Sequence, residues 1–320
     1  MLVSIVIPCY RQGHFLRTAI DSALAQTYAQ VEVVVVNDGS DDDTDAVARS
    51  YGSGITYISQ QNRGLPLARN AGTEVAKGDY LLFLDADDAI HSQAIEWMTS
   101  AIVKPGSSII VGAYATFVDS PDVLLPCEMP AVQQYQDELV GLIQGNFGPP
   151  HCYLVPTALV RSIGGFEKSM PPCADWDCWV RLVVAGGRVT AIPQVTAFYR
   201  DVIGSMSKNL DQMLISRSQV LIRLHDSLRE KSLLKQYGTI LMETESRVIR
   251  RYYARGLRHE TLQQLKQMTK ELSDLGFKPP ETAKQRIARV LFGWNSEALL
   301  VAWYRLTDRS HFAFLSNGYT

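Results

Sequence analysis

One stretch decides the fold: Tyr80-Leu81-Leu82-Phe83-Leu84-Asp85-Ala86-Asp87-Asp88. Its run of large hydrophobic residues is typical of a strand that is buried on both faces inside a parallel sheet. Carboxylates follow where the strand ends, and ligands of open α/β sheets bind beyond the carboxyl ends of the strands. Asp85 and Asp87 can present oxygen atoms to a hard divalent cation, Mg²⁺ or Mn²⁺, which would bridge them to a diphosphate. The alternative is that the carboxylates cap the next helix, which we expect to begin near Ser92.

The composition is that of an ordinary globular protein, and the charge is divided unevenly along the chain. With 320 residues, the chain is long enough for one large α/β domain with an appendage or for two domains. A hydrophobic content of 46% and a net charge of -2 exclude a disordered chain and a general nucleic-acid binder. Residues 1–205 hold 12 Lys+Arg against 22 Asp+Glu, and residues 206–320 hold 19 against 11. We therefore expect the two parts to have different electrostatic roles.

The ends and the cysteines bear on localisation. Residues 1–8 lack a basic region and a long apolar run, so they predict a first strand and no signal peptide. No apolar run reaches the roughly eighteen residues that a membrane span needs. The five cysteines form no CxxC pair, which argues against a disulfide framework and a zinc site. We expect a cytoplasmic protein that is soluble or peripheral to the inner face of the membrane.

Strand and helix patterns alternate in the first part of the chain. Expected strands cover residues 3–7, 31–36, 55–59, 80–84 and 108–118, and expected helices cover 14–26, 41–50, 64–76 and 93–103. This alternation predicts a parallel, doubly wound sheet with polar turns along one edge, where Asp38 and Asp85 share one crevice. Less regular patterns follow, with helices expected at 137–144, 156–163 and 175–185 and strands at 152–155 and 189–200. Helical patterns dominate beyond residue 207, at 221–234, 240–253 and 260–275.

Several motifs in this order resemble the family-2 glycosyltransferases, inverting enzymes that use nucleotide-sugar donors. They are Val3-Ser4-Ile5-Val6-Ile7-Pro8-Cys9-Tyr10, Val35-Val36-Asn37-Asp38-Gly39-Ser40-Asp41-Asp42, Asn62-Arg63-Gly64-Leu65-Pro66-Leu67-Ala68-Arg69-Asn70, Phe83-Leu84-Asp85-Ala86-Asp87-Asp88, Gly164-Gly165-Phe166, Asp175-Trp176-Asp177-Cys178-Trp179-Val180-Arg181-Leu182 and Tyr199-Arg200. The resemblance covers residues 1–207 and implies an α/β fold of GT-A type, a Rossmann-like, doubly wound, mostly parallel sheet with a C-terminal helical region. We expect a nucleotide-sugar-binding and catalytic domain at 1–206 and a basic helical region at 207–320.

The resemblance also implies a donor site. Pro8 and Tyr10 match positions that hold the base and the ribose, and Asp38 matches an aspartate that accepts a hydrogen bond from uracil. Arg69 matches a basic residue of the nucleotide pocket. The alternatives are a turn-capping role for Asp38 and a solvated helix arginine for Arg69.

The same resemblance makes Asp85-Ala86-Asp87 the DXD motif. It implies that Asp85 faces the ribose, that Ala86 lies against the donor, and that Asp87 ligates the Mn²⁺ or Mg²⁺ ion that bridges the diphosphate. A divalent cation suits this reaction because the leaving nucleoside diphosphate gains negative charge as the glycosidic bond breaks.

The resemblance implies that Asp175 is the catalytic base. Inversion requires direct attack by the acceptor hydroxyl while a carboxylate takes its proton. Asp177 is the second candidate base, and the alternative for Asp175 is an N-cap. Ala174 departs from the family, which usually has Glu there. Trp176 and Trp179 bind a sugar ring or, since aromatics at helical spacing are typical of a core, pack inside the protein.

Two further positions bear on the phosphate and acceptor regions. Relatives often carry a histidine two residues past the Tyr-Arg motif, where this chain has Val202, so metal affinity is expected to be modest. The loop Gly204-Ser205-Met206-Ser207 is a candidate lid. His151 follows Gly148-Pro149-Pro150 in the presumed acceptor region and is a candidate ligand or catalyst.

The last third of the chain is basic and aromatic. Arginines interleave with apolar residues between 247 and 258, and Trp, Tyr and Arg occur together in 288–305. This combination suits docking on an anionic bilayer or a partner protein. The alternative is a set of helices that pack on the acidic domain or on a second copy of the chain.

These patterns together predict an inverting, metal-dependent glycosyltransferase. We expect it to transfer a hexosyl or N-acetylhexosaminyl group from a UDP-sugar to a hydroxyl of a saccharide or lipid-linked acceptor, in polysaccharide biosynthesis. One alternative is a nucleotidyltransferase, which would need a basic Gly-rich phosphate loop that Pro8-Cys9-Tyr10-Arg11-Gln12-Gly13 does not provide. The other is a catalytically silent scaffold that binds a nucleotide-sugar.

Overall fold

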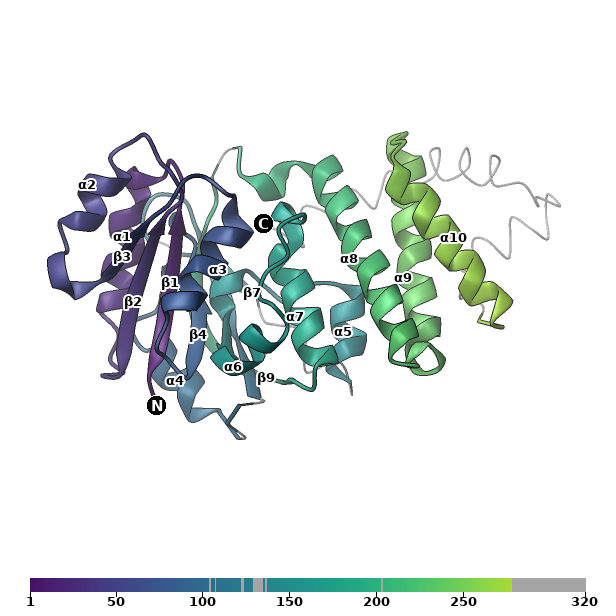
Figure 1. Ribbon diagram of the computed structural model, residues 1–320, viewed down its shortest axis with the longest axis horizontal. Helices are drawn as coiled ribbons and strands as arrows, with labels where there is room; N and C mark the ends of the chain where they lie inside the picture. Colours follow the sequence, from purple (N-terminus) through teal and green to yellow (C-terminus); the bar gives the residue numbers. More distant parts are fainter. Residues whose placement is uncertain are drawn as a thin grey trace. The chain divides into compact units, whose positions relative to one another are not determined.

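The computed structural model describes residues 1–277, except 104, 107, 122–123, 129–134, 136 and 203. The chain divides into two compact units, Met1–Ile203 and Gly204–Thr320 (Figure 1). Expected features at 288–305 lie outside the described residues.

The first half of unit 1 is a parallel sheet flanked by helices. Its elements are β1 (Val3–Cys9), α1 (Gly13–Leu24), β2 (Val31–Asn37), α2 (Thr44–Arg49), β3 (Thr56–Ser59), α3 (Leu65–Val75) and β4 (Tyr80–Phe83). β1 pairs with β2 on one side and β4 on the other, both parallel, so that Val3 lies between Val31 and Tyr80. β3 adds to β2, also parallel. The expected alternation is confirmed for this half.

The second half of unit 1 extends the sheet with strands of both directions. Its elements are β5 (Ala89–Ile90), α4 (Ala94–Ser100), β6 (Ser108–Phe117), β7 (Leu124–Glu128), α5 (Glu138–Gln144), β8 (Tyr153–Pro156), α6 (Thr157–Ser162), α7 (Ala174–Val184) and β9 (Arg188–Arg200). The strand order is β3-β2-β1-β4-β8-β6-β9-β5, and β7 pairs with β6.

The parallel pairing that the strand-helix alternation predicts does not hold for all strands of this half. β8 runs antiparallel to both β4 and β6. β5 pairs antiparallel with β9, and β7 pairs antiparallel with β6. A short buried segment such as Tyr153–Pro156 carries no signal of its direction, because both of its faces are apolar in either orientation. β6 and β9 are parallel, which leaves the expected mostly parallel, Rossmann-like fold class confirmed.

The core of unit 1 lies on both faces of the sheet. On α1, Leu16, Ala19, Ile20 and Ala23 recur at helical spacing and join the buried cluster beneath the sheet. On α3, Gly72 lets the helix approach the sheet closely, because an added Cβ would lie 2.3 Å from a Val6 methyl group.

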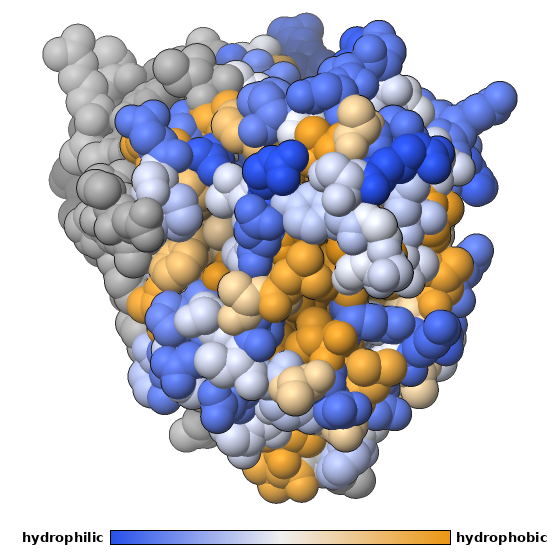
Figure 2. All heavy atoms as spheres, turned by 90° about the vertical axis from the view of Figure 1, so that its left-hand side faces the viewer, coloured by the Kyte–Doolittle hydropathy of each residue, from blue (hydrophilic) through white to orange (hydrophobic). Residues whose placement is uncertain are grey.

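β3 ends the sheet on the side that Figure 2 shows. None of its four residues is buried, and apolar residues on this side are interspersed with hydrophilic ones (Figure 2). An edge strand of this kind is short and partly polar, which limits pairing with other chains.

Unit 2 contains a bundle of three helices, α8 (Leu210–Glu230), α9 (Leu234–Arg255) and α10 (Glu260–Asp274), within the described residues (Figure 1). Each packs on the other two. Leucine is the commonest buried residue of the three helices, and Gly256 ends α9 in the left-handed conformation that suits glycine. Among the helices described, none is long and apolar enough to cross a bilayer.

The bundle also buries a polar network. His225 and Glu245 are fully buried, and His225 Nδ1 lies 3.1 Å from a Glu245 carboxylate oxygen. Thr269 donates to the other Glu245 oxygen at 3.0 Å. Glu271 lies 3.8 Å from His225 Nε2 and pairs with Arg229 at 3.1 Å. Each charged group of this network thus has a partner of opposite charge or a hydrogen bond.

Candidate active site

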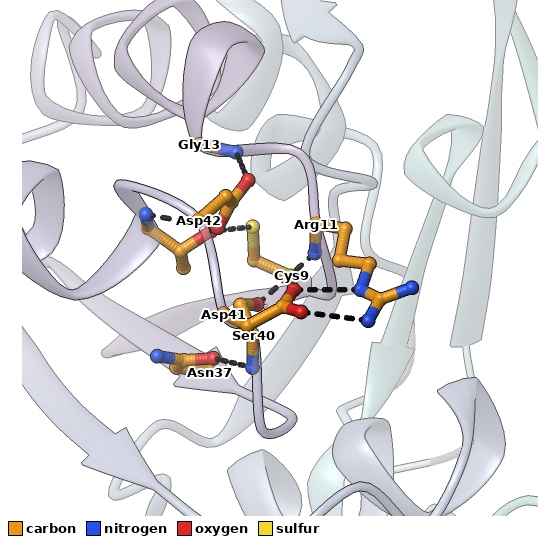
Figure 3. Close-up of polar contacts among 8 residues, drawn as sticks. Cys9, Arg11, Gly13, Asn37, Ser40, Asp41 and Asp42 are labelled. Atoms are coloured by element: carbon orange, nitrogen blue, oxygen red, sulfur yellow. Dashed lines mark hydrogen bonds and ion pairs between the residues drawn. The ribbon is translucent and has the colours of Figure 1, made fainter.

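The loops that follow β1 and β2 are joined by polar contacts (Figure 3). Arg11 takes the left-handed conformation, its backbone N–H donates to Ser40 Oγ at 3.0 Å, and its guanidinium binds both Asp41 oxygens at 2.7 and 2.8 Å. Asn37 Oδ1 accepts from the Ser40 N–H, three residues further along, at 2.9 Å. The two loops therefore hold each other at the carboxyl edge of the sheet.

A second set of contacts fixes the start of α1. Asp42 accepts from the backbone N–H of Gly13 at 2.9 Å and from Thr44 with its other oxygen (Figure 3). Only glycine fits at position 13, because an added Cβ would lie 2.6 Å from the Thr44 nitrogen. These contacts keep the acidic segment Asp41-Asp42-Asp43 in a loop, so α2 begins at Thr44 and not at the expected residue 41.

Asp38 is buried and serves as a backbone anchor. One carboxylate oxygen accepts from Gln60 Nε2 at 2.7 Å and from the Arg63 N–H at 2.9 Å, and the other accepts from the Gly64 N–H at 2.8 Å. Gly64 has a positive φ of 90°, which glycine alone adopts readily. Asp38 therefore fixes the loop that leads into α3.

Pro8 and Tyr10 lie at the end of β1 with different exposure. Pro8 is buried within the strand, whereas Tyr10 is 41% exposed. The Arg11 guanidinium lies 5.2 Å from the Tyr10 ring centroid. The exposed ring is a surface on which a base or ribose can stack.

Arg69, on α3, is only 3% exposed, so the interpretation as a solvated helix arginine is wrong. Its Nη2 donates to Asp85 at 2.6 Å, and its guanidinium lies 5.3 Å from the Phe166 ring centroid. Its buried Nε has no hydrogen-bond partner within the described part of the chain. A buried charge of this kind requires a partner of opposite charge, which here is the first aspartate of the DXD motif.

The segment Asp85-Ala86-Asp87, which was expected to be the DXD motif, begins two residues after the end of β4. Ala86 is buried, while Asp85 and Asp87 are partly exposed. Burial and the neighbouring charge of Asp85 raise the pKa of Asp87 to about 6. The capping alternative is wrong, because α4 begins at Ala94 with Gln93 as its N-cap residue. The carboxylates beyond the end of β4 therefore do not cap α4.

Asp88 and Arg200 bind each other and fix the backbone at Asp87. Asp88 is buried and accepts from the Arg200 N–H at 2.7 Å, and Arg200 Nε donates to the Asp87 carbonyl at 2.6 Å. Burial and the two neighbouring aspartates raise the pKa of Asp88 well above its ordinary value. His151 lies 3.3 Å from Asp88, and burial lowers the pKa of His151 to about 4. Because His151 is fully buried, it belongs to this supporting frame.

The donor set fits a divalent cation that a diphosphate helps to hold. Within residues that the structure describes, no three His, Cys, Asp or Glu side chains form a metal site on their own. Mg²⁺ commonly binds through one or two carboxylates together with substrate phosphates and water. Burial and then the charge of Asp85 raise the pKa of Asp87, and a cation would favour its ionised form.

Asp175 lies in the first turn of α7, where Cys173 is the N-cap residue, so the N-cap alternative is wrong. Burial raises the pKa of Asp175, and the charges of Arg69 and Asp85 act on it in opposite directions. The candidate base is thus within electrostatic range of the DXD motif. Asn146 Nδ2 donates to Asp175 at 2.7 Å.

The neighbours of Asp175 on α7 have structural contacts. Asp177 is buried and pairs with Arg181 at 2.7 Å, and Arg181 in turn donates to the carbonyls of the turn that contains Gly165. Trp176 donates to the Leu142 carbonyl at 2.8 Å, and Trp179 is packed against Tyr153 and Phe83. Both tryptophans are buried, which favours their interpretation as core residues.

The sheet, its helices and the carboxylates beyond β4 define a glycosyltransferase domain of GT-A type. The chain belongs to glycosyltransferase family 2: the family model described as "Glycosyl transferase family 2" matches residues 4–163. An uncharacterized glycosyltransferase of Rickettsia prowazekii (strain Madrid E) is 32% identical over 285 residues, which span 79% of this chain and 87% of the relative.

Solved structures with low sequence identity share the fold. S. aureus TarS 1–349 in complex with UDP has a TM-score of 0.67 at 17% identity, covering 98% of this chain and 92% of that one. The mannosyltransferase PcManGT of Pyrobaculum calidifontis, in complex with GDP-Man and Mn²⁺, has a TM-score of 0.56 at 16% identity, covering 96% and 87%.

Proposed function

We propose that this family-2 glycosyltransferase is an inverting, metal-dependent enzyme that transfers a sugar from a UDP-sugar to a hydroxyl of a saccharide or lipid-linked acceptor. The observation that carries the proposal is the pair Asp85 and Asp87 at the strand end, with Asp87 at a raised pKa of about 6 and the Asp175 carboxylate within electrostatic range. Mn²⁺ with a nucleotide-sugar in PcManGT supports the choice of cofactor. UDP in TarS supports the choice of donor.

In this mechanism Asp87 would hold the cation, and Asp85, already paired with Arg69, would face the ribose. A bound Mn²⁺ or Mg²⁺ ion acts as a Lewis acid and stabilises the charge that grows on the departing diphosphate. Arg69 pairs with the Asp85 carboxylate and fixes it in one orientation. The anchoring of the Asp87 carbonyl by Arg200 limits movement of the motif.

Asp175 would act as general base. The acceptor oxygen bonds to the anomeric carbon, its proton passes to the Asp175 carboxylate, and the bond to the diphosphate oxygen breaks, with its electron pair leaving on the nucleoside diphosphate. Attack opposite the leaving group inverts the anomeric configuration. Burial raises the pKa of Asp175, which makes its carboxylate a stronger base.

The nucleotide would lie across the ends of β1 and β2. Tyr10 offers an exposed ring for stacking, with Pro8 near it at the strand end. Ala86, between the two aspartates, would lie against the donor. Asp38 already accepts three hydrogen bonds, so it would contact uracil through the oxygen that accepts only from Gly64. Its main effect on the donor is to fix the surrounding loop.

The experiment is a donor hydrolysis assay with purified protein, a panel of UDP- and GDP-sugars and Mn²⁺, in which release of the nucleoside diphosphate is measured with and without EDTA. We expect metal-dependent release from a UDP-sugar. Binding without any release would support the silent scaffold instead, and consumption of a nucleoside triphosphate with pyrophosphate release would support a nucleotidyltransferase.

We further propose that the basic helical region contacts an anionic membrane surface. Burial, together with the like charges of Arg217 on α8 and of Arg247 and Arg250 on α9, lowers the pKa of Arg251 to about 10. Guanidinium groups suit phosphate recognition, since their geometry allows bidentate hydrogen bonds. A second copy of the chain on the same surface is the alternative outcome of the test.

A further inference from the structure

Asn146 lies outside the motifs that the family resemblance rests on, in the segment between α5 and β8. Its Nδ2 donates to Asp175 Oδ2 at 2.7 Å. The two residues are 29 positions apart, so the contact exists only because the fold brings the end of α5 against the start of α7. α5 and α7 pack on each other.

The orientation of the Asn146 amide is determined by its other end. Its Oδ1 accepts from the Tyr153 hydroxyl at 2.9 Å and from the Phe147 N–H at 2.9 Å. Both of these partners donate hydrogen to Oδ1, and an amide NH₂ group could not accept them. The NH₂ group is therefore directed at Asp175 and cannot exchange places with the oxygen.

The other end of the contact is rigid. Tyr153 is fully buried in β8, and its ring stacks on Trp179 with 4.5 Å between centroids and 18° between planes. Trp179 belongs to α7, the helix that carries Asp175. A series of contacts therefore leads from α7 back to α7, through Asp175, Asn146, Tyr153 and Trp179 in turn.

We infer that Asn146 is a positioning residue for Asp175, holding its carboxylate in one orientation for proton transfer; this inference rests on the proposed function. An amide N–H donates to a carboxylate but does not take up its proton, so it fixes the base without competing for the proton. The same bond favours the ionised carboxylate and lowers the pKa of Asp175, against the effect of burial.

The test is the pH dependence of nucleoside diphosphate release from the UDP-sugar that gives turnover, measured with Mn²⁺ for the wild-type chain and Asn146→Ala. Loss of a hydrogen bond to a charged group raises the carboxylate pKa, so the acidic limb should move up by about one pH unit or more. The variant should lose roughly 10-fold below the limb and recover toward higher pH. An acidic limb that superimposes on that of the wild type would overturn the inference, whatever the loss in rate.

Two variants serve as controls, and a third separates this inference from the proposed function. Gln144→Ala removes a nearby amide that bonds Tyr135 and should leave the limb in place. Tyr153→Phe keeps the ring stack on Trp179 but removes one donor to Asn146. It should move the acidic limb in the same direction as Asn146→Ala, by a smaller amount. Tyr153→Phe takes the place of Asn146→Ala if the latter does not fold. Asp175→Asn should be inactive. If Asp175→Asn is active, the proposed base is wrong; if it is inactive and the Asn146→Ala limb does not move, only this inference fails.

Discussion

The acidic cluster beyond β4 and the polar core of the helical bundle both bury ionisable side chains, but their charges are compensated differently. In the bundle, Glu245 has His225 and Thr269 as partners. Beyond β4, burial and the charge of Asp85 raise the pKa of Asp87, and burial and the charges of Asp87 and Asp85 raise the pKa of Asp88; the cations near them are Arg69 and Arg200. Both regions contain buried, packed residues, so they differ in how their charges are compensated and not in how well they are packed.

This difference separates a structural network from a ligand site. Burial of a charge is costly unless a partner offsets it, and in the bundle the partner is supplied by the chain. At the end of β4 burial, followed by the like charge of Asp85, raises the pKa of Asp87 to about 6. Uncompensated carboxylates at a strand end are a reason to expect a cation from outside the chain.

The largest effect on activity is expected from removal of the cation. EDTA should abolish turnover and added Mn²⁺ or Mg²⁺ should restore it, and Asp87→Ala should lose metal-dependent UDP binding, measured by calorimetry, without a change in melting temperature. Asp79→Ala, at the opposite end of β4 and exposed, is the matched control and should keep both. Full activity in excess chelator would show that the carboxylates are not a metal site.

A second prediction concerns the candidate base. Asp175→Asn should bind the donor but lose transfer by ~10² to 10⁴-fold, the usual contribution of a positioned general base. Asp177→Asn should instead lower the melting temperature, because its carboxylate pairs with Arg181. The opposite pattern, an inactive Asp177→Asn and an active Asp175→Asn, would reverse the two assignments.

The third prediction tests whether the bundle network is structural. Glu245→Ala leaves His225 and Thr269 without their partner and should cost about 3 kcal/mol in the free energy of unfolding, measured by urea denaturation. Burial raises the pKa of Glu245, so the folded state binds the proton more tightly and stability should fall as pH rises through the raised pKa. Glu245→Gln should remove this pH dependence; an unchanged slope would assign it to another group.

The smallest effect is expected for the basic surface. Binding to phosphatidylserine vesicles in a sedimentation assay should weaken as salt is added, because screening shortens the reach of the attraction. Arg250→Gln removes one cation worth about 1 kcal/mol, roughly a 5-fold change in binding. Equal sedimentation with neutral and anionic vesicles would favour a dimer or intramolecular contact, and sedimentation equilibrium would then identify a dimer.

The sequence was sufficient for features that are local. The strand that ends in Asp85 and the helix that carries Asp175 follow from short apolar patterns, and their family motifs are continuous in the chain. Asn146 could not be found in this way, because its partners are a carboxylate 29 residues later and the hydroxyl of Tyr153 on β8. No periodic pattern marks a single amide in a loop.

Burial was also difficult to predict for charged residues. Arg69 on a short amphipathic helix has the same local pattern whether it is solvated or paired, and only the tertiary contact with Asp85 distinguishes the two. The burial of Asp38 was equally difficult to predict, because its partners lie in the loop at 60–64 that follows the next strand. In both cases the deciding partner is distant in sequence.

The position of β8 has a consequence for synthesis of the chain. β8 closes the side of β4 that faces away from β1, yet it is made some seventy residues later, since Leu82 pairs with Leu154. As the polypeptide leaves the ribosome, β3, β2, β1 and β4 can assemble from nearby segments, while the outer edge of an entirely apolar strand stays open. Open edges of this kind attract other chains. The nascent protein therefore has an interval, between the emergence of β4 and that of β8, in which chaperone protection matters most.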